Sequence, residues 1–513
     1  MYRVKALIST LFLLVGMLNL TAEISEKKLK TLYHHLHPKS VAQHLAFYEL
    51  YGPTPMGQQA LRDTWNLLLG ETAPSSIKEI TFRPSSSLIS AMIALINRPT
   101  DQALPIIDEA DLQALKKLSD HLSHVHLRGH QAQTESEVLE LPLEEIDLAR
   151  GLFLSQFGAD LTQVRLYEAL LDLMALQIKA YLSPQATAIE KIQAINQFVF
   201  EEMGFRFPPH SVYAKDIDLY TFLPSVLDSR RGVCLGVSIL YLCLAQRLAL
   251  PLEMITPPGH IYIRYRSADQ EVNIETTRRG IHIDSEDYLS LETRALQQRT
   301  IKEVIGLVHF NQASVFWQQE DYAQALITYQ KAEPYLTDDP LLKELMGYIY
   351  LFTGQQQMGE QLLHQIKDYV PDYALSSGTI AIDYLEGQAD LEGIKAIFKT
   401  VDKNRQSILS KKELLESVVN RHPRFRTAIF QLAIAWIQLY RTREALQVLQ
   451  LYQNLEPDDP EANYYLAVLY GQRLDYSKAW KHLRQAEDFV IKFKHAPKIL
   501  KKLRQTLERR CPE

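Results

Sequence analysis

The fold is decided by the stretch Arg231-Gly232-Val233-Cys234-Leu235-Gly236-Val237-Ser238. It opens a largely apolar run that continues to Leu250 and keeps apolar residues at helical spacing. The pattern predicts a buried helix with Cys234 in its first turn. Backbone N–H groups and the positive end of the helix dipole favour an anion at that end. Because thiolate is the reactive form of cysteine, Cys234 is a candidate nucleophile.

Two runs of β-branched and aromatic residues follow this helix, at 260–265 and 271–276. They predict two strands joined by a short turn. In an antiparallel hairpin with an even-numbered turn, His260 and Glu275 lie on one face together with Arg264. A slip of one residue would move Glu275 to the other face. Arg264 is a candidate for binding an acidic substrate group, and the alternative is a salt bridge to a neighbour such as Glu275.

Three side chains occur in the chemical order of nucleophile, general base and base-orienting group: Cys234, His260 and Glu275. Asn196 lies in a helix upstream and is a candidate oxyanion donor, because side-chain amides stabilise a developing negative oxygen. Each assignment has a structural alternative. Cys234 would then be a buried structural cysteine like Cys243. His260 would be a core histidine, and Asn196 a helix-surface amide bonded to water or backbone.

Four separated segments carry a resemblance to a known family, at 196–205, 226–234, 244–251 and 257–260. They read Asn-Gln-Phe-Val-Phe-Glu-Glu-Met-Gly-Phe, Val-Leu-Asp-Ser-Arg-Arg-Gly-Val-Cys, Leu-Ala-Gln-Arg-Leu-Ala-Leu-Pro and Pro-Pro-Gly-His. In this order they resemble the transglutaminase-like superfamily, and most closely its bacterial SirB branch. The resemblance extends over about residues 141–288.

The resemblance implies a papain/transglutaminase-like domain with a small antiparallel sheet. It also implies that Cys234 is the nucleophile and that His260 is the family histidine. Glu275 falls where the family usually has Asp, and it is one methylene longer. Many SirB-type relatives have proline at the position of the nucleophile, whereas this chain has Gly-Val-Cys. This difference favours an active site.

Composition limits the classes of function. The chain has 513 residues, long enough for two or three domains, and its 46% hydrophobic and 23% charged residues are ordinary for a globular protein. A net charge of −6 and a pI near 6.3 give no indication of nucleic-acid binding. The three cysteines are Cys234, Cys243 and Cys511. Their odd number and irregular spacing argue against a disulfide framework and against a cysteine zinc cluster.

Residues 1–22 resemble an export signal, with a basic start, an apolar core and the small residue Ala22 at a plausible cleavage point. We therefore expect a periplasmic or secreted protein. The apolar stretch is short for a spanning helix, which needs about 20 residues. An uncleaved N-terminal membrane anchor is the alternative, and we expect no other membrane segment.

From residue 301 onward the sequence predicts pairs of helices. Ala433 and Ala467 are 34 positions apart, as are Ala445 and Ala479, and this is the period of tetratricopeptide (TPR) repeats. The basic segment 492–510 is expected to contain a capping helix. The predicted organisation is a signal peptide, a helical N-terminal region, a transglutaminase-like domain and TPR-like repeats, at 1–22, 23–140, 141–300 and 301–513. The predicted fold class is α+β and mostly α, ending in a TPR α-solenoid.

Two histidine groups and one predicted loop contain candidate metal ligands. The histidines are His34, His35, His37 and His44, and His121, His124, His126 and His130. We interpret both groups as solvated helix surfaces, because a metal site needs further ligands and a second shell. Residues 402–413 have the length and several ligand positions of an EF-hand loop, but Ser407 replaces the turn glycine. We interpret this segment as a connector between helices, and we expect no metal and no cofactor.

Two functions fit these observations. The first is a thiol enzyme that performs acyl transfer or hydrolysis on peptide or glutamine amides, with the repeats recruiting a protein partner. The alternative is a catalytically inactive transglutaminase-like/TPR scaffold for protein–protein interaction. The sequence does not identify the substrate, and it does not distinguish a hydrolase from a transferase.

Overall fold

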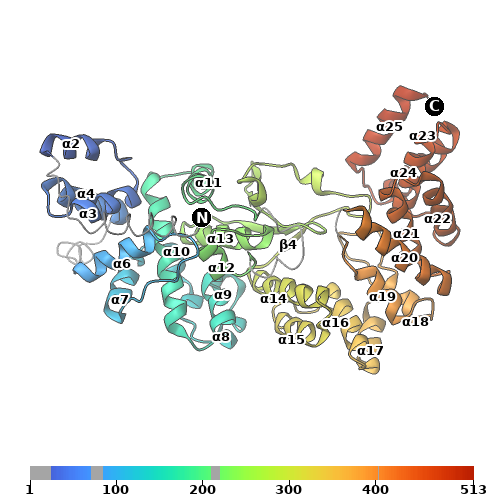
Figure 1. Ribbon diagram of the computed structural model, residues 1–513, viewed down its shortest axis with the longest axis horizontal. Helices are drawn as coiled ribbons and strands as arrows, with labels where there is room; N and C mark the ends of the chain where they lie inside the picture. The colour runs from blue at the N-terminus through green and yellow to red at the C-terminus, as the bar shows by residue number, and fades with distance from the viewer. Residues whose placement is uncertain (1–24, 71–84, 209–219, 402–403, 513) are drawn as a thin grey trace, which may run out of the picture. The chain divides into compact units, whose positions relative to one another are not determined.

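The computed structural model describes residues 25–70, 85–208, 220–401 and 404–512. The predicted export signal at 1–22 lies outside these residues. In its described part the chain is mostly α-helical with a small four-stranded antiparallel sheet, as the sequence predicts (Figure 1). Across the described helices, none is both long and apolar enough to cross a membrane.

The chain is divided into two compact units. The first contains Met1–Pro99, Leu104–His121 and Leu173–Gln185. The second contains Thr100–Ala103, Leu122–Asp172 and Ala186–Glu513. All the candidate catalytic residues belong to the second unit. The domain boundaries suggested by the sequence remain predictions.

The first unit is helical. Its helices are α2 (Glu26–His34), α3 (Val41–Tyr51), α4 (Pro55–Leu69), α6 (Ser86–Ile96) and α7 (Glu109–Ser119). The last four each begin after a Ser, Thr or Asp whose side chain accepts a backbone N–H of the first turn. The apolar run 88–96 lies in α6 and is largely buried.

The surface interpretation of the first histidine group is confirmed for His34, His35 and His37, which are exposed. It is wrong for His44, which is buried. The Nδ1 atom of His44 lies 2.8 Å from the carbonyl oxygen of Ser40, one turn earlier. This backbone partner allows the imidazole to be buried.

The second unit begins with helices that surround the predicted Cys234 helix. They are η1 (Ser123–His126), η2 (Arg128–Gln131), α8 (Glu135–Leu139), η3 (Leu143–Glu145), α9 (Leu148–Phe157), residues 161–172 of α10 (Leu161–Tyr181), α11 (Ala188–Asn196), the π-helix η4 (Gln197–Glu202) and α12 (Leu223–Ser229). The predicted helix itself is α13 (Cys234–Arg247). Every residue of α13 from Leu235 to Ala245 is buried. A helix that is apolar on all sides is a core helix, so the prediction is confirmed.

The sheet has the strand order β3-β2-β1-β4 and is antiparallel throughout. Its strands are β1 (Glu253–Thr256), β2 (Tyr262–Arg266), β3 (Glu271–Ile274) and β4 (Gln297–Arg299). Arg266 pairs with Glu271, which is the register expected from an even-numbered turn. The predicted hairpin is therefore confirmed as β2–β3. β1 and β4 were not predicted, because runs of four and three residues carry too little periodicity.

Helices fill the rest of the second unit. They are α14 (Ile301–Gln318), α15 (Tyr322–Ala332), α16 (Pro340–Phe352), α17 (Gln356–Ile366), α18 (Ile380–Leu385), α19 (Leu391–Phe398), α20 (Arg405–Arg421), α21 (Arg426–Gln438), α22 (Thr442–Leu455), α23 (Pro460–Gln472), α24 (Tyr476–Lys492) and α25 (Lys498–Arg510). Successive helices pack in pairs, α14 with α15, α16 with α17, α21 with α22 and α23 with α24. This is the helical-repeat architecture that the sequence predicts.

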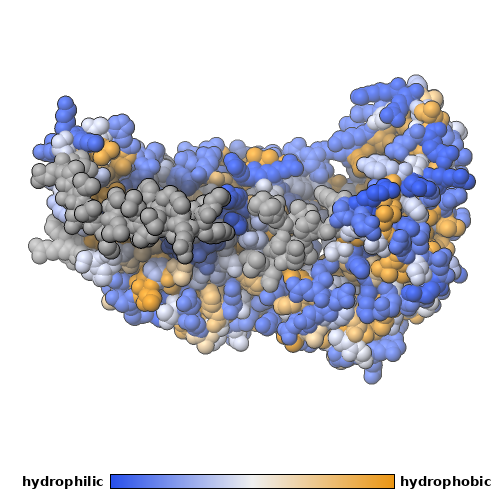
Figure 2. All heavy atoms as spheres, viewed as in Figure 1, coloured by the Kyte–Doolittle hydropathy of each residue, from blue (hydrophilic) through white to orange (hydrophobic). Residues whose placement is uncertain are grey.

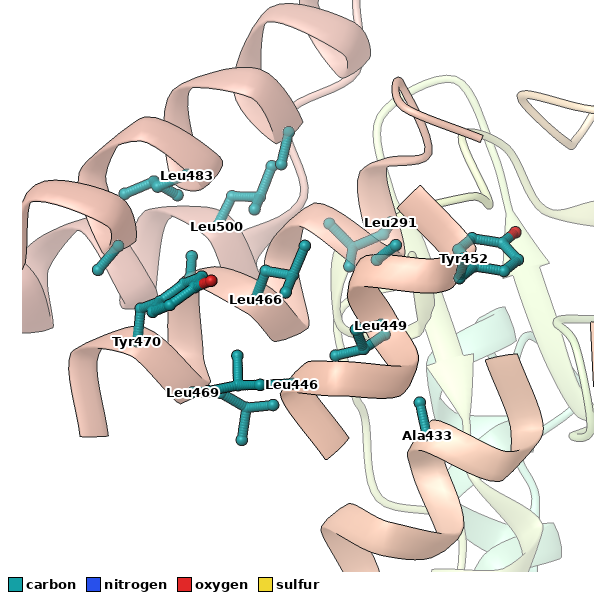
Figure 3. Packing of buried hydrophobic residues seen from close by; sticks show 14 of the residues in the cluster. Leu291, Ala433, Leu446, Leu449, Tyr452, Leu466, Leu469, Tyr470, Leu483 and Leu500 are labelled. Atoms are coloured by element: carbon teal, nitrogen blue, oxygen red, sulfur yellow. The ribbon is translucent and has the colours of Figure 1, made fainter. Parts of the chain in front are cut away.

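The 34-residue period is visible in the packing. Ala433, Ala445, Ala467 and Ala479 all have 0% exposure, because paired helices approach closely at small residues. Leucines and tyrosines fill the space between them, as Figure 3 shows for Leu446, Leu466 and Tyr470. Leu291, which precedes the repeats in the chain, packs into the same cluster (Figure 3).

Candidate active site

Cys234 is the first residue of α13 and is partly exposed. The N-cap residue is Val233, whose apolar side chain accepts no backbone N–H. The chain at Tyr220 crosses this first turn, and its carbonyl oxygen accepts the Val233 N–H at 3.1 Å. A Cβ atom on Gly236 would lie 2.2 Å from that same oxygen, so only glycine permits the approach. Gly236 thus allows the backbone at Tyr220 to pack directly against the first turn of α13.

His260 ends a tight turn, in which its N–H donates to the carbonyl of Pro257 at 3.0 Å. It lies two residues before β2, whereas the sequence predicted that the strand begins at His260. The turn proline and glycine explain the difference, since they end regular pairing. The Nε2 atom of His260 lies 2.7 Å from Oε2 of Glu275. Cys234 lies close enough to His260 to raise the pKa of the imidazole, so the three predicted side chains come together.

Glu275 follows β3, where its N–H donates to the carbonyl of Ile281 at 3.0 Å. Its Oε1 accepts the backbone N–H of Thr277 at 3.1 Å and the Thr277 hydroxyl at 2.6 Å. Its Oε2 accepts the hydroxyl of Tyr288 at 2.6 Å in addition to the contact with His260. Burial alone would raise the pKa of Glu275, but these hydrogen bonds lower the pKa to about 2. The carboxylate is therefore ionised at neutral pH and held in one orientation.

Hydrogen bonds with Cys234 and Glu275 raise the pKa of His260 to about 9, although partial burial opposes the shift. The imidazole is therefore protonated at neutral pH. Its side chain is 29% exposed, so solvent reaches it.

Two tyrosines support the imidazole from one side. The ring of Tyr288 stacks on His260 with centroids 5.7 Å apart and planes 10° from parallel. The ring of Tyr262 stacks on Tyr288 at 4.5 Å. Tyr288 ends the short helix η8 (Ser285–Tyr288). The position of the imidazole is thus fixed by packing as well as by Glu275.

A buried hydroxyl pair ties the nucleophile helix to the segment that carries Glu275. The Oγ of Ser238 in α13 lies 3.0 Å from Oγ1 of Thr276, which begins η7 (Thr276–Arg278). Both side chains are almost completely buried. Buried polar pairs resist displacement because an unpartnered hydroxyl is costly.

Asn196 ends α11 beside this assembly. Its Oδ1 accepts the hydroxyl of Tyr241 at 3.0 Å, and its Nδ2 donates to the carbonyl of Gly280 at 3.4 Å. Gly280 has a φ of +77°, and a Cβ there would lie 2.2 Å from the Asn196 amide oxygen. These contacts match the structural alternative for Asn196. Its role as an oxyanion donor stays a prediction.

Arg264 is buried and forms a salt bridge with Glu253 of β1, with Nη2 and Oε2 2.7 Å apart. The salt-bridge alternative for Arg264 is therefore confirmed, but the partner is Glu253 and not Glu275. Glu253 was overlooked because the sequence did not predict β1. Arg264 therefore links β2 to β1 through Glu253 and does not present its charge to a substrate.

The surface interpretation of the second histidine group is wrong for His124 and His130, and both ring nitrogens of the half-buried His121 are also shielded from solvent. His124 and His130 are 0% and 4% exposed, whereas His126 is exposed. The error arose because the segment is two 3-10 helices, η1 and η2, and not the predicted surface helix. With Asp147 they form a group whose ligand atoms lie within 4.8 Å of one another.

The calcium alternative at 402–413 does not fit the described residues. α20 begins at Arg405, and the Asn404 side chain caps it by accepting the Ser407 N–H at 2.8 Å. A continuous helix from residue 405 cannot wrap its side chains around an ion as an EF-hand loop does. Residues 405–413 form the first half of α20, so the interpretation of the segment as a connector between helices is wrong for these residues.

Residues 165–309 match the family model described as Transglutaminase-like superfamily. The chain is 27% identical over 118 residues to "F-box only protein 21" of Mus musculus, which covers 23% of this chain and 17% of that protein. It is 26% identical over 97 residues to a "UPF0162 protein" of Xylella fastidiosa (strain Temecula1), which covers 19% of this chain and 34% of that protein. The chain thus spans about a third or less of these relatives. All three candidate catalytic residues lie within the matched 165–309 region.

Two solved structures share low similarity with the chain. "MamA RS-1 ArsTM double mutant" is 15% identical with a TM-score of 0.20, and the match covers 36% of this chain and 95% of that one. "MamA 41-end from Desulfovibrio magneticus RS-1" is 16% identical with a TM-score of 0.19, and the match covers 36% and 96%. The paired helices of this chain, such as α21 with α22 and α23 with α24, themselves form the repeats.

Proposed function

We propose that the chain is an exported, SirB-type transglutaminase-like protein whose Cys234, His260 and Glu275 act on peptide or glutamine amides. The observation that carries the proposal is the placement of Cys234 beside His260, whose Nε2 lies 2.7 Å from Oε2 of Glu275. Nucleophile, base and orienting group in direct contact are the geometric signature of covalent acyl transfer.

The chemistry follows from the contacts of the imidazole. With Nε2 held by Glu275, Nδ1 is the nitrogen left to exchange a proton with the thiol. The Cys234 thiolate adds to the amide carbonyl and forms a C–S bond. His260 then gives its proton to the departing nitrogen as the C–N bond breaks, and a thioester remains. Attack by water completes hydrolysis, and attack by an amine completes acyl transfer.

The repeats are proposed to recruit the protein that carries the amide. Helical repeats build extended surfaces for partner segments, and several apolar side chains of these helices are exposed. Among them are Leu451 of α22 and Ile491 of α24, at 55% and 65% exposure, and Leu474 in the loop between α23 and α24 is 70% exposed. Figure 2 shows hydrophobic residues among the hydrophilic surface of the C-terminal repeats. Ion pairs from Lys498 of α25 to Glu286 and Asp287 join the last repeat helix to the η8 segment that carries Tyr288.

The alternative is a scaffold that binds partners without turnover. It is favoured by the same helix pairs, since partner binding requires no thiol chemistry. In this case Cys234 and His260 would keep their contacts as a structural pair, and substitution of Cys234 would leave every function of the protein intact.

The test offers the protein glutamine-rich unfolded casein together with a fluorescent primary amine. Release of ammonia reports hydrolysis of the side-chain amide, amine incorporation reports acyl transfer, and new peptides on a gel report backbone cleavage. We expect at least one signal from the parent protein and none from Cys234→Ala. Equal signals from both proteins would refute the thiol mechanism. If neither the parent protein nor Cys234→Ala gives any of the three signals, and the Cys234 thiol is unreactive at neutral pH, the result would favour the scaffold.

A further inference from the structure

A second polar cluster lies inside the helical part of the second unit. Its members share nearly complete burial, and they are His124, His130, Asp147, Arg150, Glu168, Asp172 and Arg247. Arg247 belongs to α13, the helix that begins with Cys234. Charged groups at this depth persist only when each one is paired.

The two arginines each have a carboxylate partner. The Nη1 atom of Arg150 lies 2.9 Å from Oε2 of Glu168, and the Nε atom of Arg247 lies 2.7 Å from Oδ1 of Asp172. Asp147 remains as a third carboxylate. The cluster therefore contains three carboxyl groups and two guanidinium groups.

Each imidazole has one nitrogen beside a carboxylate. The Nδ1 atom of His130 lies 3.2 Å from Oδ2 of Asp147. The Nε2 atom of His124 lies 3.2 Å from Oδ1 of Asp172, although it is out of line for a hydrogen bond. For His124, the neighbouring Asp172 has the position of the usual second-shell partner of a metal-binding histidine, because such a contact orients the other ring nitrogen toward an ion. Asp147, beside His130, belongs to the group of candidate ligands itself.

The other nitrogens are the unusual feature. Nδ1 of His124 and Nε2 of His130 are buried and have no hydrogen-bond partner among the described residues. The two rings meet edge to face with centroids 5.0 Å apart. A buried imidazole nitrogen without a partner is rare in native proteins and calls for a water or an ion.

We propose that His124, His130 and Asp147 bind a divalent first-row transition-metal ion, with Zn²⁺ as the reference ion. One ligand atom from each residue lies within 4.8 Å of the others. Ligand atoms bound to one zinc at about 2.1 Å lie at most about 4.2 Å apart, so movements of about 1 Å close the shell. Imidazole nitrogen suits zinc, iron, copper and nickel better than calcium or magnesium.

Such an ion would connect three elements around the nucleophile helix. His124 and His130 come from η1 and η2, while Asp147 caps α9 by accepting the Arg150 N–H at 3.3 Å. α13 packs against η1 and α9. Metal binding would therefore stabilise the packing behind Cys234 without touching the thiol, which makes it a structural site separate from the proposed catalysis.

The test uses the full chain with Cys234→Ala, because a thiol beside an imidazole would otherwise compete for zinc. After exposure to one equivalent of Zn²⁺ and dialysis, the metal content is measured by mass spectrometry. We expect about one zinc per chain in this parent protein and a rise in its melting temperature with added zinc. In His130→Gln we expect loss of the stoichiometric zinc and of the rise. His126→Gln is the matched control, because His126 is exposed in the same segment, and it should behave like the parent.

A second measurement does not depend on the folding of a variant. X-ray absorption at the zinc edge of the parent should show imidazole nitrogen and carboxylate oxygen and no sulfur. Zinc that is absent after dialysis, retained equally by His130→Gln, or bound through sulfur would each overturn the proposal. None of these results bears on the amide chemistry, which is tested with the Cys234 thiol intact.

Discussion

The molecule contains the same pair of groups, a carboxylate beside an imidazole, in two different settings. In the candidate active site the imidazole of His260 is 29% exposed, and its free side meets Cys234. In the buried cluster His130 is 4% exposed beside Asp147, and its free side meets another histidine, His124. The chemistry open to each pair depends on the group beside the second imidazole nitrogen. It also depends on whether solvent reaches the imidazole.

The difference extends to the carboxylates. Glu275 accepts four contacts, from His260, Tyr288 and both donors of Thr277, and so has a fixed orientation. In the buried cluster, by contrast, Asp147 contacts Nδ1 of His130, while Nε2 of His130 and both ring nitrogens of His124 have no hydrogen-bond partner among the described residues. The first pair is organised to move a proton, whereas the second is organised to receive an ion.

The largest effect is expected from Cys234→Ala. Loss of the nucleophile should reduce amide turnover by at least about a thousandfold, because residues of a catalytic triad act as a unit. Fold and partner binding should be retained, since Cys234 is partly exposed. Cys243→Ala is the matched control in the same helix. Burial raises the pKa of the Cys243 thiol, so it stays protonated at neutral pH and its loss should leave turnover unchanged.

Arg247→Leu should have the largest effect on stability. It removes the guanidinium that pairs with Asp172 in the buried cluster. Breaking one side of a buried ion pair typically costs about 3–5 kcal/mol. Urea unfolding measures the loss, and Arg247→Leu combined with Asp172→Leu should recover part of it. A loss below about 1 kcal/mol would mean that the cluster is open to water.

Glu275→Gln should slow turnover by about 10- to 100-fold, less than His260→Ala, if Glu275 only orients the base. The amide keeps the size of the side chain but removes the negative charge beside the imidazole. The pKa of His260 should therefore fall from about 9 toward its usual value. Titration of the imidazole by NMR measures the shift. Equal unfolding of both variants in circular dichroism would instead mark these residues as structural.

The stability that Glu275 and His260 provide should depend on pH. The pKa of His260 is raised from 6.5 to about 9, so its contribution is complete below pH 6.5 and disappears as the pH rises through 9. The pKa of Glu275 is lowered from 4.5 to about 2, so its contribution is complete above pH 4.5 and disappears as the pH falls through 2. The difference in melting temperature between the parent and Glu275→Gln should be largest between these limits. A difference that is unchanged above pH 9 would contradict the ion pair.

The smallest effect is expected from Tyr288→Phe. It removes the hydroxyl that donates to Glu275 at 2.6 Å and keeps the ring that stacks on His260. One hydrogen bond to a charged group contributes about 1.5–3 kcal/mol at most, and three other contacts to the carboxylate remain. We expect turnover to fall only severalfold. A loss as large as that of His260→Ala would give Tyr288 a role in proton transfer.

The sequence predicted the elements whose pattern is local and long. The apolar run after Cys234 predicted α13, and the alternation around residues 260–276 predicted the register that pairs Arg266 with Glu271. Both patterns are set by side chains close together in the chain. The repeats were found for the same reason, because their 34-residue period is repeated in the sequence itself.

The contacts missed from the sequence depend on long-range packing. Tyr288 reaches Glu275 from thirteen positions away through η8, and nothing in the spacing marks it. Thr277 could have been found, since a hydroxyl two residues after a carboxylate is a common turn partner. The burial of His124 and His130 depends on packing against α9 and α13, which no local pattern reveals. Short strands such as β4 are fixed by their neighbours and not by their own three residues.

The most direct test of the central claim is the pH dependence of Cys234 alkylation by iodoacetamide, with His260→Ala as the control. Free cysteine reacts half-maximally near pH 8.5. We predict that Cys234 reacts well below about pH 8.5, near neutrality, and that this reactivity is lost in His260→Ala. A thiol that reacts only at alkaline pH, and equally in both proteins, would contradict a functional thiol–imidazole pair.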